Sequence, residues 1–161
     1  MTARTLTLLA AILSTAAAPL SAQASIAGTW TAVVPDAVKN EDGVQSVIST
    51  TTATLVLEMR GDSVVGTFKR LKSPVARAIA GTVSGATVVL HANTQARMIL
   101  NGEEQTLALI TTYRFTLDGY TLRGTSETKI DPASKPPTMA AMMATGVEQS
   151  PVPVTATRVK G

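Results

Sequence analysis

The sequence predicts an all-β protein, an antiparallel up-and-down β-barrel of about eight strands with one short helix or irregular segment before the last strand. Three observations carry this prediction. Several runs alternate with the period of two that is typical of half-buried strands. Short turn sequences separate those runs. Threonine is abundant while Leu-rich helical periodicity is almost absent, which favours sheet over helix.

The alternation is clearest in two segments. Residues 53–60 place Ala, Leu, Leu and Met on one face and Thr, Val, Glu and Arg on the other. Residues 107–117 repeat that period over a longer span. The dipeptides Asn101-Gly102 and Asp118-Gly119 fit two-residue hairpin turns, whose central residues need positive φ. Each of these segments is therefore expected to be a strand of a hairpin.

The order of strands predicts how the sheet closes. The expected strands are 26–34, 48–60, 63–72, 76–83, 86–100, 104–117, 120–128 and 152–159. Short turns make successive strands antiparallel neighbours. Eight such strands close economically into a barrel, which removes both exposed edges. A sandwich of two sheets remains an alternative that the same pattern allows.

The first 24 residues are predicted to be a secretory signal peptide. Arg4 supplies the positive start, residues 6–13 form a short apolar core, and Ala22-Gln23-Ala24 is a small-x-small cleavage site. The apolar core is shorter than the roughly 20 residues that span a bilayer. We therefore expect residues 25–161 to form a single exported domain, in the periplasm or outside the cell, with no membrane span.

Two long connections interrupt the strands. Residues 35–47 form a polar stretch after the first strand, and residues 129–151 contain several prolines and a Met/Ala run. Connections of this length in a compact domain are usually lids or irregular segments. Met139, Met142 and Met143 would give such a lid an adaptable apolar surface.

Composition excludes several function classes. The chain has 161 residues, no cysteine and one histidine, so it lacks a disulfide framework, a thiolate zinc site and a thiol nucleophile. The formal net charge of +3 comes from scattered residues, which makes nucleic acid a poor partner. No common catalytic motif is found in the sequence. We expect no catalytic residues, no cofactor and no metal ligands.

A Gly-Thr pair occurs four times, at Gly28, Gly66, Gly81 and Gly124, where glycine would let neighbouring strands pass closely. Together with the segments 26–30, 65–68 and 154–160, this pattern resembles the calycin barrels, the lipocalins and the avidin/streptavidin family. The resemblance implies a barrel whose first and last strands meet. It also implies that the opening Trp30 lies under a basic side chain of the closing strand, here Arg158.

The sequence departs from the biotin binders of that group. Trp30 is the only tryptophan, whereas the streptavidin type lines its pocket with several. Ala32, Phe68, Arg70 and Val154 stand where that family has polar ligand contacts. Biotin binding is therefore not expected.

Two function classes follow. The first is a lipocalin-like barrel that binds a small, mainly apolar molecule in its mouth. The candidate ligand residues are Phe68, Arg77, Tyr113, Met139, Met142 and Met143. The alternative is a protein-interaction module, such as an inhibitor of a secreted hydrolase, that uses the same loops. The face on which Arg77 lies is left open, because the alternation places either Arg77 or its alanine neighbours inside the barrel.

The processing site can be tested directly. Because the apolar core is too short to anchor the chain, we expect the exported protein to begin at Ser25. Intact-mass measurement of the exported fraction checks this. Retention of residues 1–24 on the exported protein would contradict it.

Overall fold

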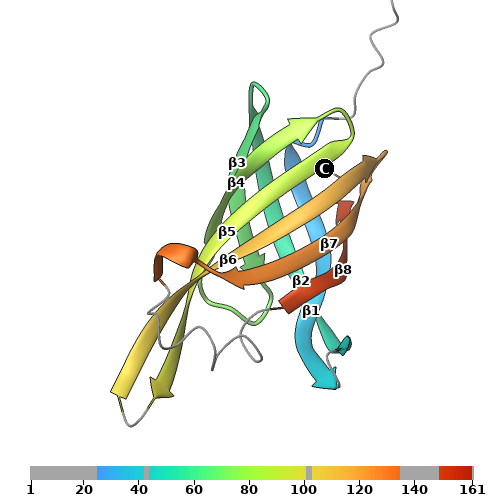
Figure 1. Cartoon of the computed structure of the whole chain (residues 1–161). Coiled ribbons are helices and arrows are strands. Elements are labelled where there is room, and N and C mark those ends of the chain that lie inside the picture. Colours follow the sequence, from blue (N-terminus) through green and yellow to red (C-terminus); the bar gives the residue numbers. More distant parts are fainter. Residues whose placement is uncertain (1–24, 42–43, 101–102, 135–148, 161) are drawn as a thin grey trace, which may run out of the picture.

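The computed structural model describes residues 25–41, 44–100, 103–134 and 149–160 and forms one closed antiparallel barrel (Figure 1). Its strands pair in sequence order, and the last closes on the first. They are β1 (Gly28–Glu41), β2 (Val44–Arg60), β3 (Ser63–Arg70), β4 (Arg77–Ser84), β5 (Thr87–Leu100), β6 (Glu103–Asp118), β7 (Thr121–Ile130) and β8 (Gln149–Arg158). A single 3-10 turn, η1 (Pro132–Ser134), precedes β8. The predicted fold class is confirmed, and the two-sheet alternative is excluded.

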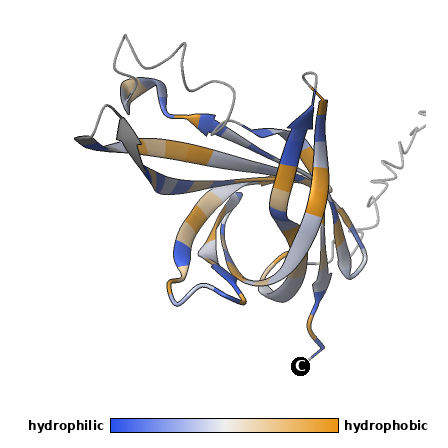
Figure 2. Cartoon of the chain, turned by 90° about the horizontal axis from the view of Figure 1, so that it is seen from below, coloured by the Kyte–Doolittle hydropathy of each residue, from blue (hydrophilic) through white to orange (hydrophobic). Residues whose placement is uncertain are grey.

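The alternating apolar residues form the barrel interior. Hydropathy changes from residue to residue along the strands, as period-two burial requires (Figure 2). Trp30, Leu55, Leu90 and Leu122 are among the fully buried side chains, and they come from strands on every side of the barrel. Because these large residues meet in one cluster, the interior is filled by side chains.

Three of the four Gly-Thr glycines sit where two backbones approach too closely for any side chain. A Cβ at Gly66, Gly81 or Gly124 would lie 1.8–2.0 Å from a carbonyl oxygen of the neighbouring strand. Each of these glycines is paired with a buried Leu or Phe on that strand. The repeat is thus a packing device of a strongly coiled sheet.

The barrel closes through a short seam between β1 and β8. Only four residue pairs join these strands, from Trp30 opposite Arg158 to Val33 opposite Thr155. The Arg158 guanidinium carbon lies 5.7 Å from the centroid of the Trp30 ring. Its Nη1 donates to the Ser25 carbonyl at 3.0 Å, and its Nη2 donates to the Ala27 carbonyl. One side chain therefore joins the end of β8 to the segment just before β1.

The seam ends at a pair of prolines. The Val159 amide donates to the Thr29 carbonyl at 2.9 Å, so alternate residues of β8 before it direct their backbone polar groups toward β1. Continued by two residues, the register would set Pro35 of β1 opposite Pro153 of β8. Neither proline has an N–H to donate, so that rung cannot form. Beyond it β1 and β8 are not paired with each other.

The expected connection 35–47 is instead regular strand. β1 continues to Glu41 and β2 begins at Val44, with register shifts between Pro35 and Val38. This part of the hairpin extends past the barrel, so both its faces meet water and no apolar alternation marks it. The expected connection 129–151 is likewise shortened by β7, η1 and β8, and its residues 135–148 lie outside the described part. Within the described ranges, no helix is long and apolar enough to cross a membrane.

Removing the contacts of the seam should lower stability in a defined order. Trp30→Ala should destabilise strongly, by about 3–5 kcal/mol, because it empties a fully buried site. Arg158→Lys should cost less than Arg158→Ala, since the lysine retains the positive charge near the Trp30 ring but not the forked hydrogen bonds. Urea unfolding measures all three.

Arg123→Ala is the matched control, because Arg123 is exposed on the outer wall of β7. Equal unfolding midpoints for Arg158→Ala and Arg123→Ala would show that the guanidinium contributes nothing to closure.

Candidate functional site

A hollow of about 190 Å³, lined by Ser25, Ile26, Met59, Asp62, Val83, Gly85 and Leu117, lies beside the segment that precedes β1. A smaller recess lies at the mouth, the end opposite the Trp30–Arg158 seam. Its volume is about 30 Å³, room for about two water molecules. It is lined by Val34, Pro35, Phe68, Arg70, Arg77, Thr111, Tyr113, Ser126, Thr128 and Gln149. Most of these residues are polar, in contrast to the apolar cluster that fills the barrel beneath them.

Strand register brings two arginines to this space. Phe68 is buried on the inner face of β3, and Arg70 follows two residues later on the same face. Arg77, the first residue of β4, pairs with Phe68 across the β3–β4 ladder. It shares the inner face with the buried Ile79, while Ala78 beside it is exposed on the outer wall. Arg77 therefore faces the mouth.

Tyr113 forms the floor between the two arginines. Its ring centroid lies 5.5 Å from that of Phe68 and 6.0 Å from that of Phe115, on which it stacks. Burial raises the pKa of Tyr113, and the charges of Arg70 and Arg77 oppose that rise only in part. The phenol is protonated at neutral pH, so it can donate a hydrogen bond.

Arg70 is incompletely satisfied. Its Nε is buried and has no hydrogen-bond partner among the described residues. Its Nη1 lies 3.8 Å from Asp36 of β1, which also lies 3.9 Å from Lys72. Both pairs are half-exposed and long, so each contributes little. A buried donor without an acceptor costs on the order of 1–3 kcal/mol.

Positive charge is in excess around the mouth. Arg70, Lys72 and Arg77 face one carboxylate, Asp36, and no acidic side chain of the described residues lies within 4.0 Å of the Arg77 guanidinium. The two inner threonines do not offset this charge, since Thr111 Oγ1 and Thr128 Oγ1 bond each other at 3.0 Å. Asp36 is thus the carboxylate at the mouth, and the acceptors that line the space itself, such as Ser126 and Gln149, are uncharged.

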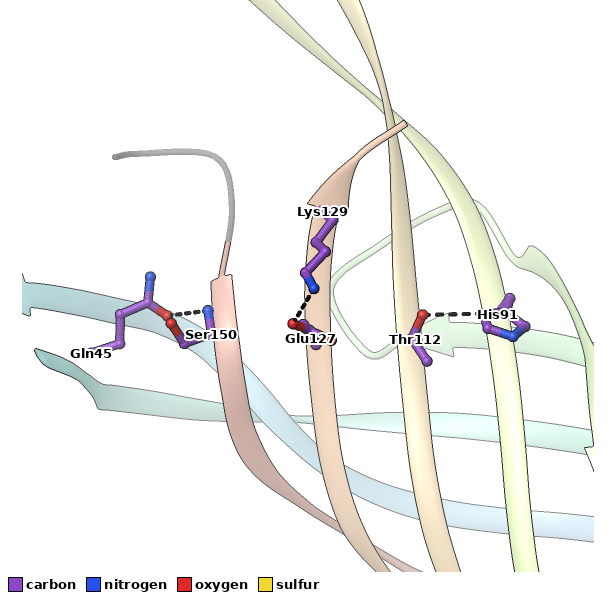
Figure 3. Close-up of polar contacts among 6 residues, drawn as sticks. All are labelled: Gln45, His91, Thr112, Glu127, Lys129 and Ser150. Carbon is purple, nitrogen blue, oxygen red and sulfur yellow. Dashed lines mark hydrogen bonds and ion pairs between the residues drawn. The ribbon is translucent and has the colours of Figure 1, made fainter. Parts of the chain in front are cut away.

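The outer wall carries a second group of polar residues, which pair among themselves. His91 Nδ1 lies 3.1 Å from Thr112 Oγ1, and Glu127 forms an ion pair with Lys129 at 2.7 Å (Figure 3). Shallow grooves of about 400 and 450 Å³ adjoin at His91 and are open to solvent. Within the described ranges, no three acidic or histidine side chains are placed to hold a metal ion.

Figure 3 also shows a hydrogen bond that joins β2 and β8 at the edge of the mouth. The Gln45 Oε1 atom of β2 accepts a hydrogen bond of 2.7 Å from the Ser150 amide of β8. This bond links the projecting β1–β2 hairpin to the start of β8. The unpaired stretch of β1 and β8 thus lies between two fixed points, the four-pair seam and this bond.

Three of the ligand residues expected from sequence, Phe68, Arg77 and Tyr113, meet at the mouth. Met139, Met142 and Met143 lie outside the described residues. The sequence identified Arg70 as a departure from the biotin binders and favoured the outer face or rim for it, so Arg70 was not among the expected ligand residues. The signal that could have found it is its spacing of two from Phe68, which puts both side chains on one face.

Comparison with known proteins identifies no relative. No family model, no curated protein and no solved structure matches the chain. The closed eight-stranded antiparallel barrel is compatible with a calycin-like fold. Likeness to that group rests on the barrel and on the short motifs of its first and last strands.

The mouth should not hold biotin. Ala32 and Val154, which replace polar contacts of the biotin binders, are buried among apolar side chains and offer no donor or acceptor. A ureido ring without its partners loses polar specificity. We expect calorimetric titration to give no submicromolar binding, and a tighter isotherm would contradict the residue comparison.

Proposed function

We propose that this protein is an exported binding barrel that takes a small molecule at its mouth. The observation that carries the proposal is the buried Arg70 Nε at the mouth, which has no hydrogen-bond partner among the described residues. Folding alone gains nothing from a buried donor without an acceptor. A ligand group that accepts this hydrogen bond would remove the cost on binding.

The filled interior limits how the ligand sits. A space of about 30 Å³ admits an end group and not a whole ring system. The rest of the molecule would lie outside, against the connection between β3 and β4. Leu71 and Val75 are exposed there, and Val75 lines a second small space together with Phe68 and Arg70. A ligand with an apolar body and a polar end fits both features.

The stretch where β1 and β8 are not paired lies beside this space and would be a route into it. Pro35 and Gln149, which belong to the two strands that separate, both line it. Because proline removes the donors from this edge, an added strand would pair poorly there. The edge therefore suits passage of a small molecule better than pairing with a peptide.

Native mass spectrometry of protein purified from its own host tests the proposal. We expect a retained small molecule in the wild type and its loss in Thr128→Phe, because the larger side chain would occupy the space that Thr128 lines. The matched control is Thr116→Phe, at an exposed position on the outer face of β6. Retention of the molecule by Thr128→Phe would place the site elsewhere and contradict the proposal.

One observation favours the second candidate, a protein-interaction module. β5 pairs with β4 only up to Ala92, and β6 pairs with β7 only from Leu109. The remainder of both strands projects from the barrel as a two-stranded ribbon (Figure 1). Its unpaired edges could accept a strand of a secreted partner. Such a partner would still bind Thr128→Phe, which separates the two candidates.

A further inference from the structure

We infer that the mouth recognises a carboxylate group, held by Arg70 and Arg77 with the Tyr113 hydroxyl as a third donor. This inference rests on the proposed function, because it names the chemical class of the ligand's end group.

The arginine donors at the mouth are not all matched by protein acceptors. The buried Arg70 Nε has no hydrogen-bond partner among the described residues, and the exposed Arg77 guanidinium has no carboxylate within 4.0 Å in that same part of the chain. Tyr113 lies close enough to both arginines for their charges to act on its phenol, and the phenol is protonated. A neutral amide or alcohol brings a donor of its own, which would meet these donors unfavourably. A carboxylate only accepts, with about four lone-pair sites.

The geometry of Arg70 distinguishes a planar anion from other anions. Its Nη1 is directed at Asp36, while its Nε is free and buried. The Nε–Nη2 edge of a guanidinium, which here includes the unpartnered Nε, presents two parallel N–H groups that match the two oxygens of a carboxylate. A lysine at this position would keep the charge but would lose this match.

Size and charge agree with one carboxylate. The space takes about two water-sized groups, as a carboxylate does, and is tight for a tetrahedral phosphate. Three cations and the single carboxylate of Asp36 leave two positive charges at the mouth. A monoanion is therefore held without bringing the mouth to net negative charge.

The test follows the Arg70 Nε–Hε signal by NMR in the chain that begins at Ser25. Benzoate is compared with benzamide, which has the same shape without charge, and with inorganic phosphate. We expect benzoate to shift the Arg70 signal to saturation and benzamide to bind roughly tenfold more weakly or worse. Phosphate should also bind more weakly than benzoate. Trp30 fluorescence, from the buried seam, reports that each variant is folded.

Variants distinguish the paired N–H groups of the guanidinium from its positive charge as the cause of binding. Arg70→Gln and Arg77→Gln should each weaken benzoate binding roughly tenfold. Arg70→Lys should weaken it also, although it keeps the charge. Arg114→Gln should leave benzoate binding unchanged. This substitution removes one positive charge, as the others do, but Arg114 lies on the outer face of β6.

Several outcomes would overturn the inference. Equal binding of benzamide, phosphate binding as tight as benzoate, or no response of Arg70 up to the solubility limit of benzoate would each do so. A neutral molecule retained from the host and lost in Thr128→Phe would also overturn it while leaving the proposed function in place. Retention in Thr128→Phe would instead remove the proposed function itself.

Discussion

The closing seam between β1 and β8 is the constraint on which the rest of the barrel depends. An up-and-down sheet that failed to close would expose two edges, and only four residue pairs prevent this. The ladder is reinforced from the side by Arg158, which lies against Trp30 and bonds two carbonyls that precede β1. The indole Nε1 of Trp30 donates to the Ile26 carbonyl at 2.9 Å, so the same short segment closes this end of the barrel. A chain without disulfides gains its circular closure in this way.

The same seam also determines where β1 and β8 stop pairing. Hydrogen bonding stops where Pro35 and Pro153 would have to face each other, and β1 then leaves β8 to pair with β2 alone. The apolar cluster lies toward the end with the Trp30–Arg158 contact. The polar side chains of the mouth lie beside the stretch where β1 and β8 are not paired. One strand register thus has two results: it sets Arg158 over Trp30 at one end of the seam, and it ends β1–β8 pairing at Pro35 and Pro153 at the other.

Sequence predicted most of this arrangement because burial in a barrel has a period of two. That period identified the inner faces that hold Phe68 and Tyr113. It could not decide Arg77, since an inner face of alanines and an inner face with Arg77 and Ile79 give the same alternation. The extension of β1 to Glu41 was missed because both faces of a projecting ribbon meet water. The burial of Arg70 Nε depends on pairing between distant strands, which no local pattern records.

Local rules are followed throughout the barrel except at the mouth. Elsewhere, the large apolar residues of the inner faces are buried, tight crossings carry glycine and exposed charges pair or meet solvent. At the mouth, two arginines line one small space, and one of them has a buried donor without an acceptor among the described residues, which costs stability. Sequences depart from their own folding rules mainly at functional sites. That departure is the reason for proposing a ligand site at the mouth.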